Sequence, residues 1–503
     1  MELLKTALDQ YKEIYNFSEE YTEVQENIVP DINPDILEIT HVNAYLISAE
    51  KSVSGETVSV SGMIETEIFY RSDIDEKPYS MKGQLACKYS YSAPGCSEND
   101  EIFADIKVMS AGAALVNSRK VALKVLTSAS VKLYQRQKTE LINGVRDAED
   151  GIQTLVRPER YTYINALAQK RLVLSEDIRA SKGEISADDS IVNAEISWHT
   201  EDVKALANKI MLRGAAELKL MLMSAVGSAV KTASYMLPFS QIIECDGVMT
   251  EDEIRVEYSV SKLLCRLGAK AENELFISCD MSADTKIVAE RSADIDIMRD
   301  IYSTIYEMEI SERETGMSAA KLSVREVPVQ IKCDPEYPAL KICGWRYACQ
   351  GKPVKNTLYG RFYFTVFYES TAGRIYSVCV KGEAETPGDK NRRGGFGLSA
   401  EDIRVEVTDS GEIEVRFQAV FRQNICVKGN DSQICGYTVC TDRKRKKAKR
   451  GTLILRSMDE DTDIWEIAKQ YGTTSASIES ANKLINAADS GSRGKLIMIP
   501  ISQ

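Results

Sequence analysis

The sequence predicts a mainly β protein with three antiparallel, sandwich-like repeat domains and a small α+β domain at the carboxyl end. Three observations support this fold class: a Gly-to-Ser spacing that occurs three times, alternating apolar residues after each glycine, and a strand, helix, helix, strand pattern in the last fifty residues. At 503 residues the chain exceeds one ordinary core, so three to five domains are expected. A hydrophobic content of 44% with 27% charged residues is typical of a soluble globular protein.

The repeated pattern is a glycine followed by an apolar or aromatic residue at +8 and a serine at +10. Its copies are Gly62 to Ser72, Gly214 to Ser224 and Gly360 to Ser370. Apolar residues occupy even offsets from each glycine, as in Phe362, Phe364, Val366 and Tyr368. Period two with one apolar face is typical of a strand in a sandwich or barrel. The glycine lies on the inward row, where it allows a bend or a close backbone approach.

Other segments set the expected domain limits. Residues 121–133 and 413–421 are further predicted strands, whereas Gln137 to Asp150 and Glu307 to Ser318 are predicted polar, helix-like connections. The first thirteen residues have the pattern of a short amphipathic helix. We therefore expect a first β repeat domain with an N-terminal helix at 1–150, a second at 151–315, a third at 316–440, a basic linker at 441–452 and a final domain at 453–503.

The final domain is predicted to contain two helices between two strands. Ile464 and the residues three, four and seven positions later are apolar, which gives one apolar helical face. Asp463 and Glu466 have the spacing of a capping box, and Gly472 is expected to end the helix. A second short helix from about Thr474 and a closing strand that ends at Pro500 complete a strand, helix, helix, strand unit.

This order of residues resembles a LysM domain, a module that binds and does not catalyse. In sugar-binding LysM domains a shallow groove lies between the loop into the first helix and the loop before the last strand. Carried onto this chain, the resemblance implies a binding groove at Asp461, Thr462, Asp463, Ile464, Leu484, Ile485 and Asn486. It implies structural roles for Trp465, Asn482, Gly494 and Pro500.

The chemistry of this groove favours a protein ligand over a glycan. The usual Gly-Asp-Thr at the helix start is replaced by Asp461-Thr-Asp463, which removes backbone freedom and adds a carboxylate. Asp463 is expected to cap the helix, Trp465 to form a wall of the fold, and Ile464 to anchor a protein partner. Asn482 is expected to hold the following loop by side-chain hydrogen bonds. Binding of peptidoglycan through N-acetylglucosamine remains the alternative.

One basic tract interrupts an otherwise acidic chain. Residues Arg443 to Arg450 contribute +7 to a formal net charge of −12, so the remaining residues carry −19. A solvated, self-repelling linker is the favoured interpretation, because no aromatic residues interleave the charges as nucleic-acid binding would require. Peripheral contact with anionic lipid headgroups is a further possibility.

Composition argues against an enzyme, a metal site and a cofactor. The twelve cysteines are dispersed, and the closest pairs, Cys343 with Cys349 and Cys435 with Cys440, lack CxxC spacing. His41 and His199 are the only histidines, and both lie in strand-like segments. No apolar run approaches the roughly 20 residues of a membrane span. The first residues lack an apolar signal-peptide core, so a cytoplasmic protein with reduced thiols is expected.

Several segments resemble a domain of unknown function that recurs in clostridial sporulation proteins. They are Val29 to Ile36, Val42 to Tyr45, Asn117 to Val121, Leu237 to Ser240 and Asp300 to Thr304. Three such domains followed by a LysM domain make the chain similar to the SipL family of spore coat assembly proteins. The resemblance implies a mother-cell scaffold at the forespore surface, whose LysM domain binds the coat morphogenetic ATPase, stage IV sporulation protein A.

Overall fold

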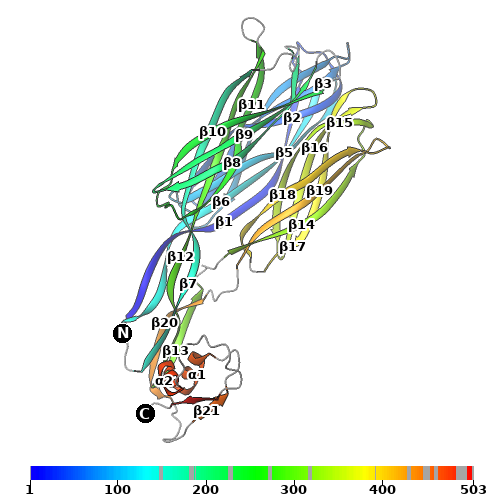
Figure 1. Ribbon diagram of the computed structural model, residues 1–503. Helices are drawn as coiled ribbons and strands as arrows, with labels where there is room; N and C mark the ends of the chain where they lie inside the picture. Colours follow the sequence, from blue (N-terminus) through cyan, green and yellow to red (C-terminus); the bar gives the residue numbers. More distant parts are fainter. Residues whose placement is uncertain are drawn as a thin grey trace.

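The computed structural model describes most of the chain as β strands in antiparallel sheets, which confirms the mainly β prediction (Figure 1). Within the described residues, no helix has the length and apolar character needed to cross a bilayer. The structure describes residues 2–146, 151–179, 186, 189–224, 230–269, 275–314, 320–390, 392–426, 432–445, 454–457, 463–482 and 496–500.

The first unit contains six strands in two facing sheets. A three-stranded sheet, β2-β3-β4, packs against a second sheet in which β6 lies between β1 and β5. Apolar side chains from both sheets meet in one core, which includes Ile64, Tyr70, Leu123 and Leu133. The strands are β1 (Glu2–Ile28), β2 (Ile36–Ser54), β3 (Thr57–Ser72), β4 (Pro78–Ser92), β5 (Glu101–Asn117) and β6 (Lys120–Arg146).

The second unit repeats this topology strand by strand. Its sheet β8-β9-β10 packs against β11-β12-β7, and the core between them includes Leu218, Leu220 and Ile277. A single pairing, Tyr11 with Ile164, joins β1 of the first unit to β7. The strands are β7 (Ile152–Arg179), β8 (Ser190–Leu206), β9 (Lys209–Met223), β10 (Val230–Glu244), β11 (Glu253–Ala269) and β12 (Leu275–Ser303).

The third unit has the same order, with each of its long strands divided in two. The sheet β15-β16-β17 packs against β14-β19-β18, while β13 pairs with β20. Its core includes Phe362, Phe364 and Phe417. The strands are β13 (Tyr306–Glu314), β14 (Ala320–Cys333), β15 (Ala339–Val354), β16 (Thr357–Ser370), β17 (Ile375–Pro387), β18 (Arg392–Val407), β19 (Ile413–Cys426) and β20 (Ser432–Lys444).

The repeated Gly-to-Ser pattern lies on β3, β9 and β16, the central strand of each three-stranded sheet. A side chain at Gly62 would lie 3.0 Å from the carbonyl oxygen of Ser48, and one at Gly214 would overlap the carbonyl of His199. Both carbonyls lie beside an irregularity in the register of the preceding strand. At these two positions the glycine is needed because a bulge in the neighbouring strand brings backbone close to it, whereas a side chain at Gly360 would meet the Leu398 side chain at 2.9 Å.

The repeated serine closes the hairpin that follows the central strand. The Ser72 hydroxyl accepts a hydrogen bond from the Ile74 amide at 3.0 Å, and the Ser370 hydroxyl accepts one from the Arg374 amide at 3.3 Å. Both serines are buried. A short hydroxyl side chain at this position satisfies turn amides that would otherwise lack a partner.

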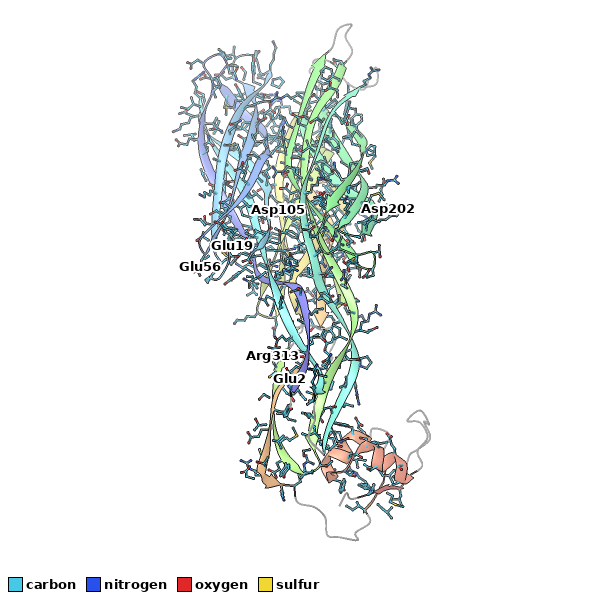
Figure 2. The ribbon with its side chains drawn as sticks, turned by 90° about the vertical axis from the view of Figure 1, so that its left-hand side faces the viewer. Glu2, Glu19, Glu56, Asp105, Asp202 and Arg313 are labelled. Carbon is cyan, nitrogen blue, oxygen red and sulfur yellow. The ribbon has the colours of Figure 1, made fainter. Side chains whose placement is uncertain are left out.

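Beyond the sandwiches, the first and last strands of each unit continue as three two-stranded ribbons, which we call the shaft. It comprises 2–11 with 136–146, 152–163 with 291–303, and 306–314 with 432–444. Figures 1 and 2 show the shaft between the sandwiches and the carboxyl-terminal helices, and Figure 2 labels Glu2 and Arg313 on it. Buried side chains from all three ribbons hold it together, among them Ile142, Met298, Ile301 and Ile434.

The predicted N-terminal helix is wrong, because these residues begin β1. Glu2 pairs with Arg146, and the ladder continues to Ile28 and Lys120. Leu3 and Leu8 pack against apolar residues of the other ribbons. A partner strand more than 100 residues away therefore overrides the local helical pattern. The connections expected at Gln137 to Asp150 and Glu307 to Ser318 are likewise strand up to Arg146 and Glu314.

The three units meet at the outer face of β2. The Asn43 side-chain amide donates a hydrogen bond to the carbonyl of Val192, and the Tyr45 hydroxyl accepts one from the Ala194 amide at 3.1 Å. Those two partners lie on β8 of the second unit. From the third unit, the Arg346 guanidinium lies 5.9 Å from the centre of the Tyr45 ring. The Val42 to Tyr45 element is therefore the place where all three units are joined.

Candidate functional site

The carboxyl-terminal residues form a small module of two strands and two helices. We call residues 454–457, 463–482 and 496–500 the C-terminal module; it contains β21 (Ile454–Ser457), α1 (Ile464–Tyr471), α2 (Ser475–Asn482) and β22 (Leu496–Ile499). The two strands pair antiparallel, with Ile454 opposite Ile499. Ile467, Ala468, Ile478, Ile497 and Ile499 are buried between the helices and strands.

Helix α1 has a defined start and end. Asp463 is the N-cap: its backbone is extended, with φ −84° and ψ 121°, and its Oδ1 accepts a hydrogen bond from the Trp465 amide at 2.9 Å. Gly472 ends the helix in the left-handed region, with φ 62°, and its amide donates to the Ala468 carbonyl. Aspartate at an N-cap and glycine after the last turn satisfy groups that a helix leaves unpaired.

Asn482 joins α2 to β22. Its Nδ2 donates to the carbonyl oxygens of Ile478 at 2.7 Å and Met498 at 2.6 Å, and its Oδ1 accepts from the Met498 amide at 2.7 Å. This side chain therefore fixes the closing strand against the helix that precedes it. Pro500 follows β22 and is half-buried, whereas Gly494 lies outside the described residues.

Trp465 connects the module to the shaft. Its indole Nε1 donates a hydrogen bond to Oδ2 of Asp300 at 2.7 Å, and its ring meets Tyr302 edge to face, with 4.8 Å between ring centres. Asp300 and Tyr302 belong to β12 of the second unit. Trp465 is 8% exposed, so it forms a wall as expected, but the wall is shared with another part of the chain.

Further polar contacts surround this tryptophan. Lys469 Nζ lies 2.8 and 2.7 Å from the two carboxylate oxygens of Asp300, whose side chain is 15% exposed. The Tyr302 hydroxyl donates to the carbonyl of Thr473 at 2.8 Å, and burial raises the pKa of Tyr302 to about 12. The Arg445 guanidinium donates to the Lys469 carbonyl and lies 5.8 Å from the centre of the Tyr302 ring. We call the residues outside the module that make these contacts, Asp300, Tyr302 and Arg445, the module seat.

The structure describes two of the seven predicted groove residues, Asp463 and Ile464, and the first contacts the shaft. Oδ2 of Asp463 lies 3.3 Å from the Arg157 guanidinium on β7. Ile464 is half-buried against the apolar cluster that includes Leu155 and Tyr302. Asp461, Thr462, Leu484, Ile485 and Asn486 lie outside the described residues.

The predicted basic linker begins inside a strand. Residues up to Lys444 belong to β20, and the Arg445 amide donates to the Ile305 carbonyl at 3.0 Å. Residues 446–450 of the basic tract lie outside the described residues. The polypeptide is therefore attached to the shaft as far as Arg445, because pairing with β13 reaches Lys444 after an irregularity between Tyr306 and Glu307.

The two histidines and the buried cysteine Cys245 have surroundings typical of structural, unreactive side chains. Burial lowers the pKa of His41 to about 3, and its ring stacks on Phe69 with 4.1 Å between ring centres. His199 is exposed, with Nε2 3.1 Å from the Ser197 hydroxyl. Burial raises the pKa of Cys245 to about 11, which disfavours a reactive thiolate. Within the described residues, no group of three His, Cys, Asp or Glu side chains has an arrangement that suits a metal ion.

Comparison with known families gives one match. A family model described as SipL, SPOCS domain matches residues 189–267, which span β8 to β10 and most of β11. A search of curated proteins found no match to the chain. Residues 189–267 are therefore similar to the SipL SPOCS domain, and this similarity suggests a role related to sporulation. The same four-strand order recurs as β2 to β5 and β15 to β18.

Proposed function

We propose that the protein is a non-enzymatic adaptor in spore coat assembly. The observation that carries this proposal is the SipL-type match in a unit whose six-strand topology occurs three times in the chain. Three similar units joined at β2 provide a body with several related surfaces, which suits a scaffold that holds other proteins. We expect this adaptor to act in the mother-cell cytoplasm, at the forespore surface.

The C-terminal module is the proposed partner-binding element. Its order of two strands and two helices, with α1 capped by Asp463 and α2 joined to β22 by Asn482, supports a LysM domain. The proposed partner is the coat morphogenetic ATPase of the stage IV sporulation protein A type. Ile464 is the proposed anchor, because an apolar side chain beside a loop gains energy when a partner buries it.

The first prediction tests this anchor in the full-length chain. Replacing Ile464→Ala removes most of the apolar side chain from the start of α1 and leaves the Asp463 cap in place. We expect the affinity for the purified ATPase, measured by titration calorimetry, to fall at least tenfold, as expected for a binding hot spot. Leu496→Ala is the matched control, since Leu496 is an exposed apolar residue on β22 of the same module.

Two results would contradict the assignment. If Ile464→Ala binds the ATPase with unchanged affinity and Leu496→Ala binds it more weakly, the binding site lies on the outer face of β21 and β22 instead. Saturable sedimentation of the full chain with purified cell wall, without ATPase binding, would favour peptidoglycan as the ligand. Co-sedimentation with anionic vesicles tests the separate proposal that the basic tract contacts lipid headgroups.

A further inference from the structure

The start of α1 is already engaged by another part of the same chain. Asp463 forms an ion pair with Arg157, and Ile464 lies against the cluster that includes Leu155 and Tyr302. These two residues are the described part of the surface to which we assign partner binding. A partner that covers the start of α1 therefore meets the shaft residues that contact Asp463 and Trp465.

We propose that the shaft and the partner compete for the start of α1, so that the module alternates between its seat and a released, partner-bound position. This inference rests on the proposed function, because it concerns the same surface of the same module. Competition implies which side chains the partner presents to α1. It also explains why the module stays on the shaft until the partner is present.

Asp300 is the centre of the seated state. Its carboxylate accepts hydrogen bonds from the Trp465 indole at 2.7 Å and from the Lys469 ammonium at 2.7 and 2.8 Å. Hydrogen bonds that involve a charged group are roughly twice as strong as neutral ones. Both donors belong to α1, so this one side chain holds the helix against β12.

The module can leave the seat without losing its own core. Of the seven buried side chains in the cluster at the seat, six belong to the module and only Tyr302 belongs to the shaft. Its apolar contact with the module is the Trp465 ring, and the polar contacts are Asp300 with Lys469, Arg157 with Asp463, and the Tyr302 hydroxyl with the Thr473 carbonyl. Water can replace the polar partners, so the main cost of release is exposure of the Trp465 and Tyr302 rings, which are 8% and 1% exposed in the seated state.

The contacts in the seated state also indicate which side chains the partner presents to α1. In the seated state α1 contacts a basic group at Asp463, the Tyr302 ring at Trp465 and a carboxylate at Lys469. A competing partner needs the same three features in the same order along its own surface. We therefore expect a binding patch with an aromatic residue between an arginine or lysine and an acidic residue.

The test releases the module by changes that lie only in the shaft. Asp300→Ala removes the acceptor for Trp465 and Lys469, and Arg157→Glu reverses the charge that faces Asp463. Neither change alters the surface of the module itself. Asp296→Ala and Arg160→Glu are matched controls, because they change exposed residues of the same types on the same two strands.

Two measurements on the full-length chain are needed. Small-angle X-ray scattering should report a larger radius of gyration for Asp300→Ala and Arg157→Glu than for the wild type. Titration calorimetry with the purified coat morphogenetic ATPase should report tighter binding by both variants. If the seat is occupied about 90% of the time, release raises the apparent affinity about tenfold. Both controls should match the wild type in both measurements.

The possible outcomes separate this inference from the proposed function. Equal or weaker binding by a variant whose module is released would overturn competition while the adaptor function stands. Unchanged scattering by both shaft variants would overturn the role of the seat. Absence of ATPase binding by the wild type and by every variant would overturn the proposed partner and the competition together.

Discussion

Single side chains in this protein acquire their roles from distant parts of the chain. Asp463 caps α1, a short-range contact that its residue type and position predict, whereas Asn482, expected to hold the following loop, bonds to Met498 on β22, 16 residues away. Asp300 and Tyr302 were not predicted as site residues, because their partners are 165 or more residues away in the sequence. The Asp300 to Thr304 segment carried a family resemblance, and that was its only sequence signal.

His41 leads to a prediction about pH. Burial lowers its pKa to about 3 in the folded protein, against about 6.5 in the unfolded chain. Below about pH 6.5 the unfolded state therefore binds a proton that the folded state does not, so stability falls as the pH decreases towards 3. Between about pH 7 and about pH 5.5 this histidine should cost about 1 kcal/mol of the free energy of unfolding.

Urea denaturation of two variants checks this expectation. His41→Phe keeps an aromatic ring on Phe69 and should remove that part of the pH dependence. His199→Gln changes the exposed histidine and should leave the dependence as in the wild type. Comparing each variant with the wild type at the same two pH values removes the contribution of the other titrating groups, which the three proteins share. An identical pH dependence in the wild type and His41→Phe would contradict the assignment.

At the scale of elements, the central strands could be predicted and the long strands could not. Alternating apolar residues identify β3, β9 and β16 because their buried face is a local property of the sequence. Residues 2–13 combine a weak helical pattern with apolar residues that pack against other ribbons, and a single sequence does not reveal the partner strand β6. The strand structure of the shaft therefore depends on pairing between segments that are far apart in the sequence.

The central strands also give a prediction. Gly214→Ala places a methyl group against the His199 carbonyl and the Phe239 ring, so it should destabilise the protein by about 1–3 kcal/mol. Gly112→Ala on β5 is the control, because among the described residues no atom beyond the two chain neighbours lies within 4 Å of the added methyl group. That change should be neutral or stabilising by up to about 1 kcal/mol. Thermal unfolding followed by circular dichroism compares the two, and equal effects would contradict the close-approach explanation.

At the scale of the whole molecule, the units are joined by buried polar contacts as well as apolar ones. Phe103 and Tyr134 of the first unit pack with Leu167 and Val288 of the second. The Glu38 carboxylate on β2 accepts hydrogen bonds at 3.0 Å from Tyr337 and from Tyr376 of the third unit. Because of these contacts we expect the three units to unfold together. A unit that unfolded alone would break hydrogen bonds and expose apolar side chains of its neighbours.

The last prediction tests this coupling. The double variant Asn43→Ala with Tyr45→Phe leaves the Val192 carbonyl and the Ala194 amide without their side-chain partners. Each unsatisfied buried group costs about 1–3 kcal/mol. We expect differential scanning calorimetry to show one transition for the wild type and separate transitions for the variant. Ser52→Ala, an exposed position on the same strand, should behave as the wild type. A single transition for the double variant would contradict coupling through β2.

Each unit begins and ends on the shaft, because its first and last strands pair with each other. A copy of the unit could therefore be added to or deleted from the gene in one piece, since the chain enters and leaves it at neighbouring points. Tandem duplication is a direct route to such an array. Relatives of this protein with two or four units would need a new set of contacts within the shaft, but no rerouting of the polypeptide.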